Sequence, residues 1–230
     1  MVSDQVDPRL RSAVDESLAW YDALCALHGV RCGIEDDTWV AYDRPPPLHS
    51  AAKTVEPTTQ PDRALTALDR FGQGSIADSF GRLDLTGAGL EVLFEARWIH
   101  REPPESPSRG LPDGWSVIRT PALLASWTAL HDTTDVLIDG LLDRSGFRVL
   151  ARQVDGRLVG GFVTHLCGGV VSVSNAWSDP AYPLDWSAMV VAAAALHPGR
   201  ALVGYEQGDD LRGALEAGFR DVGPQVVWVR

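Results

Sequence analysis

The sequence predicts an α/β fold, and three patterns support this prediction. Residues 201–230, ALVGYEQGDDLRGALEAGFRDVGPQVVWVR, indicate a short strand, a helix and a closing strand. A similar block occupies residues 74–101. Two strand-like runs, 147–154 and 158–166, flank Asp155-Gly156, a dipeptide that strongly favours a hairpin turn. Strands and helices therefore alternate toward the C-terminus, and a fainter copy of this pattern ends the first half.

The closing block carries the clearest helix signals. Asp209 or Asp210 is expected to cap its helix, and Gly218 is expected to end the helix in a left-handed conformation. Residues 222–229 are expected to form the last strand. With a one-residue gap, Gly89 of the earlier block aligns with Gly218. We infer from this match a duplication, with a degenerate first copy.

The other elements follow from hydrophobic spacing and from proline and glycine positions. In the first half we expect a helix at 12–28, strands at 38–42 and 48–55, and a helix at 61–71. In the second half we expect a strand at 115–119, helices at 121–131 and 135–143, the hairpin, a strand at 170–175, and a helix at 185–197 capped by Asp185.

One segment between the halves has the composition of a linker. EPPESPSRGLPDG, residues 102–114, is rich in Pro, Ser and Gly. We therefore predict an N-terminal domain at 1–104, a linker at 105–114 and a C-terminal domain at 115–230.

Composition limits the function classes. The net charge of −11 argues against a nucleic-acid-binding surface, because phosphate binding needs clustered Lys and Arg. The polar N-terminus and the short apolar runs predict no signal peptide and no membrane partner. The cysteines show no paired framework, so a reducing cytoplasm is the expected location. Cys25, His28 and Cys32 lie close in sequence but offer only three ligands across a helix end, so we expect no metal site.

The element order resembles that of the GCN5-related N-acetyltransferase (GNAT) superfamily. VDGRLVGGFVTHLCGGVVSVSNAW (154–177) is similar to the family's central hairpin and following strand. YEQGDDLRGALEAGFRDVG (205–223) is similar to its last strand–helix unit. The resemblance covers about 115–230, and a truncated form covers 12–101. It implies a mixed, largely antiparallel central sheet flanked by helices, present twice.

This resemblance also implies transfer of an acyl group from acetyl-CoA to a small amine. Two splayed strands would expose backbone groups for the cofactor's pantetheine arm, and a helix N-terminus would hold its diphosphate. The arm would lie along one strand segment, formed by Ser172, Val173, Ser174, Asn175, Ala176 and Trp177. Tyr205 and Glu206, at the end of the neighbouring strand, would face the substrate.

Four side chains are candidates for the chemistry, each with a structural alternative. Glu206, at the end of a buried strand, would act as base for an ammonium substrate if burial raises its pKa, or is a solvated strand-end acid. Tyr205 would serve as acid, or packs in the sheet. His165 is a further catalytic candidate, or a hydrogen-bonded structural histidine. Asn175 would orient an acyl carbonyl, or caps a turn.

Several positions depart from the family pattern and favour a second hypothesis. No glycine occurs between Asn175 and Ala188, where the family has a glycine-rich phosphate loop, and Asp179 and Asp185 add negative charge there. Ala214 stands where the family's general-acid tyrosine is expected. The alternative function is a non-catalytic GNAT-like ligand-binding or scaffold protein, with a homodimer through the C-terminal strand as one assembly.

Overall fold

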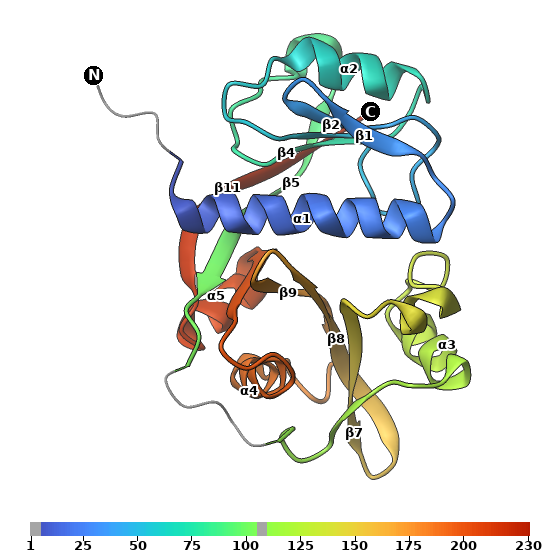
Figure 1. Cartoon of the computed structure of the whole chain (residues 1–230), viewed down its shortest axis with the longest axis vertical. Helices are drawn as coiled ribbons and strands as arrows, with labels where there is room; N and C mark the ends of the chain where they lie inside the picture. Colours follow the sequence, from blue (N-terminus) through green and yellow to red (C-terminus); the bar gives the residue numbers. More distant parts are fainter. Residues whose placement is uncertain (1–5, 105–109) are drawn as a thin grey trace. The chain divides into compact units, whose positions relative to one another are not determined.

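The computed structural model describes residues 6–104 and 110–230 and divides into two compact units (Figure 1). Unit one comprises Met1–Trp98 and Val222–Arg230, and unit two comprises Ile99–Asp221. The last strand therefore contributes most of its residues to unit one, which differs from the boundary expected from composition. Half of the predicted linker, 105–109, lies outside the described residues.

Unit one contains a long N-terminal helix, short strands and a second helix. Its elements are α1 (Pro8–Leu27), β1 (Cys32–Glu35), β2 (Thr38–Ala41), β3 (Ala52–Thr54), α2 (Pro61–Asp69), β4 (Ser75–Asp78), the 3-10 helix η1 (Thr86–Ala88), most of β5 (Glu91–Arg101) and most of β11 (Arg220–Val229). The strands β1, β2, β3, β4 and β11 are neighbours in that order. β3 and β4 are parallel, and the other pairs among these five are antiparallel.

The start of α1 and the end of the earlier repeat block differ from expectation. α1 begins at Pro8 rather than at Ser12, because Asp7 accepts a hydrogen bond from the Arg9 backbone N–H at 2.8 Å and caps the helix. The helix expected in the 74–101 block is reduced to the three residues of η1, which include Gly87. Gly89, which follows η1, has φ of 76°.

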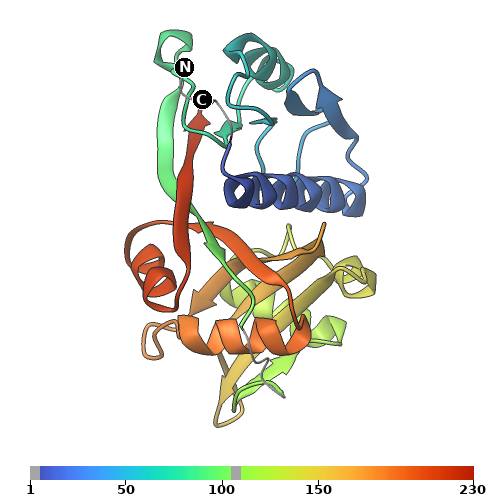
Figure 2. The same ribbon diagram turned by 60° about the vertical axis from the view of Figure 1, so that its left-hand side comes forward.

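Unit two is built around a larger, largely antiparallel sheet. Its elements are β6 (Trp115–Val117), α3 (Pro121–Leu130), the 3-10 helix η2 (Asp139–Asp143), β7 (Phe147–Val154), β8 (Arg157–Cys167), β9 (Val170–Ser178), α4 (Trp186–Leu196), β10 (Ala201–Glu206) and α5 (Gly208–Glu216). The strand order is β10-β9-β8-β7-β6, with β9 and β10 parallel and the other pairs antiparallel. Figures 1 and 2 show α3 and α4 on opposite faces of this sheet.

The core of unit two lies between the sheet and α4. Phe162, Val171 and Leu202 on the strands pack with Met189 and Ala193 of α4, and all five side chains are buried. The sequence of α4 is Ala-rich and strongly apolar, and most of its side chains pack against the sheet and α5. Burial of this cluster holds the ends of β9 and β10 in place.

Several predicted elements of unit two are confirmed. The Asp155-Gly156 turn has φ of 49° and 76°, as a type I′ hairpin requires, and joins β7 to β8. Asp185 caps α4 by accepting from the Ala188 backbone N–H at 2.9 Å. Gly218 adopts a left-handed conformation, with φ of 91°, after α5.

Two helix predictions were wrong in detail. The expected helix at 135–143 is a turn followed by η2 at Asp139–Asp143, because the backbone at Val136 and Leu137 donates to the Thr133 carbonyl and closes a local turn. The cap of α5 is Gln207, without a side-chain bond, and not Asp209 or Asp210. The two aspartates lie instead in the first turn, where their charge still favours the helix dipole.

The two units share one local arrangement. In unit one, α2 connects the parallel strands β3 and β4, and β2 flanks β3 in antiparallel orientation. In unit two, α4 connects the parallel strands β9 and β10, and β8 flanks β9 in antiparallel orientation.

None of the helices in the described residues has both the length and the hydrophobicity needed to cross a membrane.

Candidate functional site

The ends of β9 and β10 form the best candidate for a site in unit two. The two strands pair in parallel from Val170 and Ala201 to Ser172 and Val203. Beyond this point β9 continues to Ser178 and β10 to Glu206, and no further pairing between them occurs in the described residues. On its other edge β9 pairs with β8 as far as Ser178. The edge of β9 toward β10 is therefore open at its C-terminal end, as the resemblance predicted.

A β-bulge interrupts β9 at this opening. Gly161 pairs with Trp177 and Val163 with Ser174, so Asn175 and Ala176 together oppose a single residue of β8. Asn175 has φ of 51°, a left-handed conformation that asparagine tolerates better than most residues. The bulge turns the side chain of Asn175 out of the regular alternation of the strand.

Asn175 meets a histidine that the sequence did not mark as a site residue. The side chain of Asn175 hydrogen-bonds His131, the residue that follows α3. The His131 ring stacks on Trp177 at a centroid distance of 6.3 Å and lies edge-on to Trp127 at 5.4 Å. Burial lowers the pKa of His131, although the hydrogen bond that the ring donates to the side-chain oxygen of Asn175 opposes this effect. The imidazole is therefore neutral at pH 7 and offers both a donor and an acceptor nitrogen.

Glu206 has the most perturbed carboxyl group near the opening. Burial raises its pKa to about 8, and the nearby charge of Asp210 adds to the shift. Because strand side chains alternate, Glu206 lies on the same face of β10 as Leu202, which packs against α4. A carboxyl group with this pKa gains or loses its proton near neutral pH, as a general base requires.

Tyr205 and His165 occupy different surroundings. Tyr205 is exposed and points to the opposite face of β10 from Glu206. His165 pairs with Ser172 in the ladder and stacks on Phe147 at 4.2 Å. Since Ser172 lies opposite Val203, His165 stands roughly 10 Å along the sheet from the level of Glu206. The structure brings Tyr205 and Glu206 to the open strand ends but does not bring His165 there.

The structure of the whole chain is similar to solved GNAT structures. A GCN5-related N-acetyltransferase from Kribbella flavida has a TM-score of 0.67 at 14% identity, covering 94% of this chain and 95% of that one. A GCN5-related N-acetyltransferase-like protein from Streptococcus suis has a TM-score of 0.57 at 14% identity, covering 96% and 98%. The chain has the GNAT fold. A GCN5-related N-acetyltransferase from Sphaerobacter thermophilus (TM-score 0.54, 12% identity, 96% and 90% covered) has it as well. The sequence matches no protein-family profile and no curated protein.

The opened strand pair of the GNAT fold fits an extended cofactor arm in this chain. The backbone from Val173 to Trp177 borders the opening, while Ser172 is still within the parallel ladder. The indole N–H of Trp177 is buried and has no hydrogen-bond acceptor among the described residues. Backbone groups that β10 does not pair with would be available there to an extended arm such as the pantetheine of acetyl-CoA.

The N-terminus of α4 does not fit the diphosphate of the same cofactor. The Asp185 carboxylate accepts from the Ala188 N–H, which is one of the helix's free donors. Asp179 accepts from the Ala181 N–H at 2.9 Å, and Pro180 and Pro183 in the same loop have no N–H to donate. Carboxylates therefore take donors that a diphosphate would need, and they repel its charge.

The position of the family's tyrosine is also closed to catalysis. Ala214 is fully buried in the core beside Trp186 and Phe219. A Cβ added at the neighbouring Gly213 would lie 2.6 Å from the Trp186 ring, so α5 packs tightly against α4. No tyrosine side chain can reach a substrate from this face of α5.

In the described residues no group of three metal-ligating side chains occurs.

Proposed function

We propose that unit two is an N-acyltransferase that acts on a small amine, with Glu206 as the general base. The observation that carries the proposal is the position of a partly buried carboxyl group, with its pKa raised to about 8, at the end of two diverging parallel strands. The GNAT fold supports this reaction class by analogy.

Glu206 and its surroundings favour a cationic acceptor. Asp209 and Asp210 lie in the exposed first turn of α5, directly after Glu206, and add negative charge at the same strand end. An ammonium group would be attracted there, and the Glu206 carboxylate would take its proton and leave the amine nucleophilic. His131 and Asn175 supply hydrogen bonds on the bulge of the neighbouring strand.

The acyl donor is proposed to be a coenzyme A thioester, which supplies an activated acyl group when bound. The open edge of β9 would bind its pantetheine arm, while the loop before α4 gives no diphosphate site. We therefore expect weak affinity for CoA, in the range of about 0.1–1 mM, because the arm alone supplies the binding energy.

The test combines binding with turnover. Calorimetry with acetyl-CoA measures the affinity of the full chain, and release of free thiol with a panel of small amines measures transfer. Glu206→Gln is expected to lower kcat/KM about 100-fold or more while leaving acetyl-CoA affinity within about twofold. Glu216→Gln, an exposed substitution on α5, is the matched control. Equal rates for Glu206→Gln and Glu216→Gln would reject Glu206 as the base.

A second candidate function rests on the carboxylates before α4. A GNAT-fold protein whose phosphate site is occupied by its own Asp179 and Asp185 side chains would serve as a non-catalytic ligand-binding or scaffold protein. Absence of any heat or thermal shift with millimolar acetyl-CoA would favour this function over transfer.

A further inference from the structure

Unit two has a pocket of about 420 Å³ that is separate from the opened strands. Three segments line it: the end of β6 with the start of the next connection (117–119), η2 with the following loop (141–145), and the start of β7 (147–149). Arg148 pairs with Thr164 in the β7–β8 ladder, whereas Trp177 pairs with Gly161 farther along β8. The pocket therefore borders the start of β7, away from the bulge at the end of β9.

Three arginines line this pocket, in a chain with a net charge of −11. They are Arg119, Arg144 and Arg148, and Asp143 is the one acidic residue of the lining. Within the described part of the chain none of the three guanidinium groups forms an ion pair. Other exposed arginines do pair with carboxylates, as Arg31 does with Asp43 at 2.8 Å. Three arginines and one aspartate give the lining a net positive charge, and no carboxylate of the described residues pairs with these arginines.

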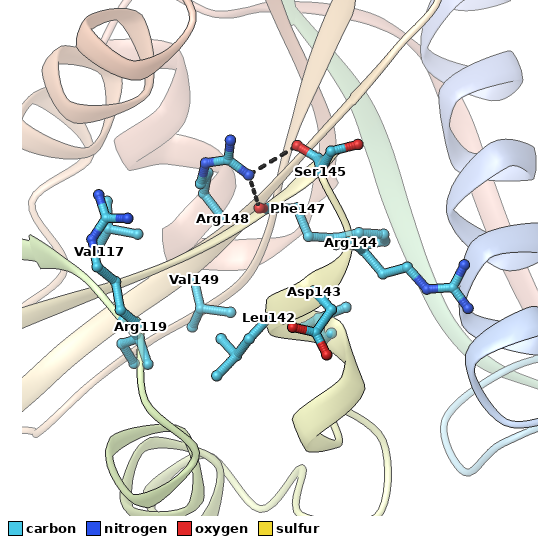
Figure 3. A pocket seen from close by; sticks show the side chains of 11 residues that line it. Val117, Arg119, Leu142, Asp143, Arg144, Ser145, Phe147, Arg148 and Val149 are labelled. Carbon is cyan, nitrogen blue, oxygen red and sulfur yellow. Dashed lines mark hydrogen bonds between the residues drawn. The ribbon is translucent and has the colours of Figure 1, made fainter.

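Backbone carbonyls hold the central arginine in place. The Nη1 atom of Arg148 donates to the carbonyl oxygens of Ser145 at 2.8 Å and Phe147 at 2.5 Å (Figure 3). Among the described residues no acceptor meets Nε or Nη2 on the other edge of the guanidinium, so these N–H groups can donate to an external acceptor. Because the side chain is already ordered, less conformational entropy is lost when an anion binds.

A second guanidinium lies on the same side of the pocket. Figure 3 shows the guanidinium groups of Arg119 and Arg148 on one side, whereas the Asp143 carboxylate points the other way and Arg144 extends outward. The local field is positive beyond the pocket too, since Arg148 and Arg200 contribute, after burial, to lowering the pKa of His197 to about 4. A bound anion would meet the donors of two guanidinium groups.

We propose that this pocket binds a small phosphate-bearing anion, with Arg119 and Arg148 as the residues that hold the phosphate. Planar guanidinium groups match phosphate oxygens in a bidentate manner, and two of them neutralise a dianion. Val117, Leu142 and Val149 in the lining give a small apolar wall for the body of the ligand. This inference does not depend on the acyltransferase proposal, because none of the pocket residues borders the strand opening.

Titration of the full chain with pyrophosphate, and with inorganic phosphate as the smaller probe, tests the site by calorimetry. We expect pyrophosphate to bind with a Kd of about 0.1–1 mM at low salt and to weaken as salt is raised, since the contacts are ionic. Arg119→Gln and Arg148→Gln are each expected to weaken binding about tenfold. Arg82→Gln in unit one removes the same charge from an exposed position and is expected to change nothing.

Two results would overturn the proposal. One is pyrophosphate affinity weaker than about 10 mM in the unmodified chain. The other is unchanged affinity in Arg119→Gln, whose side chain forms no described hydrogen bond and whose loss should leave the fold intact. If Arg148→Gln has a lower melting temperature than the unmodified chain, its weaker binding could reflect a damaged fold. The pyrophosphate affinity of Arg119→Gln then decides the test by itself. Acetyl-CoA affinity in Arg119→Gln is expected to equal that of the unmodified chain, which separates this site from the opened strands.

Discussion

The Nζ atom of Lys53 lies 5.0 Å from the centroid of the Trp98 ring in the interior of unit one. The Tyr21 ring is 5.3 Å away on another side, and Lys53 is fully buried. Its ammonium group has no hydrogen-bond acceptor among the described residues. Burial lowers the pKa of Lys53 to about 7, although the charges of Glu16 and Asp78 oppose the shift. The single lysine of the sequence is therefore a source of pH-dependent stability.

The stability of the chain should rise with pH in a way that Lys53→Met abolishes. The unfolded chain keeps the lysine proton up to about pH 10.5, whereas the folded chain releases it near pH 7. Between these values the unfolded state holds more protons, so the free energy of unfolding should rise by about 1.4 kcal/mol per pH unit relative to Lys53→Met. Urea denaturation at several pH values between 7.5 and 9.5 measures this slope. A constant difference between the two proteins over this range would contradict the prediction.

The pH profile of acyl transfer should report Glu206. Because burial raises the pKa of Glu206 to about 8, the carboxylate form increases as pH rises through this value. We expect kcat/KM to increase about tenfold per pH unit below pH 8 and then to level off. Asp210→Asn removes a like charge and should move the inflection to lower pH. An inflection that stays in place in Asp210→Asn, or persists in Glu206→Gln, would assign it to another group.

Asp185→Asn should keep the cap of α4 but remove the negative charge at its N-terminus, so the variant separates the effect of capping on stability from the effect of charge on acetyl-CoA binding. Asparagine caps helices as well as aspartate does, so we expect the free energy of unfolding to change by about 0.5 kcal/mol or less. Removal of the negative charge should tighten acetyl-CoA binding about threefold to tenfold, because the diphosphate would no longer meet a carboxylate. Calorimetry and thermal unfolding give the two quantities. Equal acetyl-CoA affinity in both proteins would show that the diphosphate does not approach α4.

Gly161 should tolerate no larger residue, because β8 and α3 approach each other closely at this position. A Cβ at Gly161 would lie 2.2 Å from Trp127 Nε1 and 2.3 Å from the Leu150 carbonyl oxygen, which are hydrogen-bonded to each other at 3.0 Å. We expect Gly161→Ala to lower the free energy of unfolding by about 3 kcal/mol. Gly87→Ala, where a Cβ meets nothing within 4 Å, is the control and should change it by less than about 1 kcal/mol. Thermal unfolding followed by circular dichroism compares the two variants.

Local chemistry explains which elements could be predicted. The Asp155-Gly156 turn, the Asp185 cap and the left-handed Gly218 all depend on residues within four positions of each other, so the sequence pattern was sufficient. η2 was predicted as a longer helix, because hydrophobic spacing does not show that the Thr133 carbonyl closes a turn upstream. The opening between the two strands was also predicted and is present, whereas the roles of Glu206 and of the strand from Ser172 to Trp177 stay predictions.

Residues far apart in sequence decided the rest. Asn175 and His131 come together only because β9 bulges beside the end of α3, and no spacing in the sequence marks that contact. The arginine-lined pocket likewise joins 117–119 to 141–149 through the β6–β7 pairing.

By itself the sequence determined the order of most strands and helices, the hairpin turn and the charge of the chain, because these depend on local conformational preference and composition. The tertiary structure decided which polar groups are buried, and burial sets their protonation. It raised the pKa of Glu206, lowered that of Lys53 and left Arg119 and Arg148 without a carboxylate partner among the described residues. Desolvation depends on packing from every direction, so it becomes visible only when the whole fold surrounds a residue.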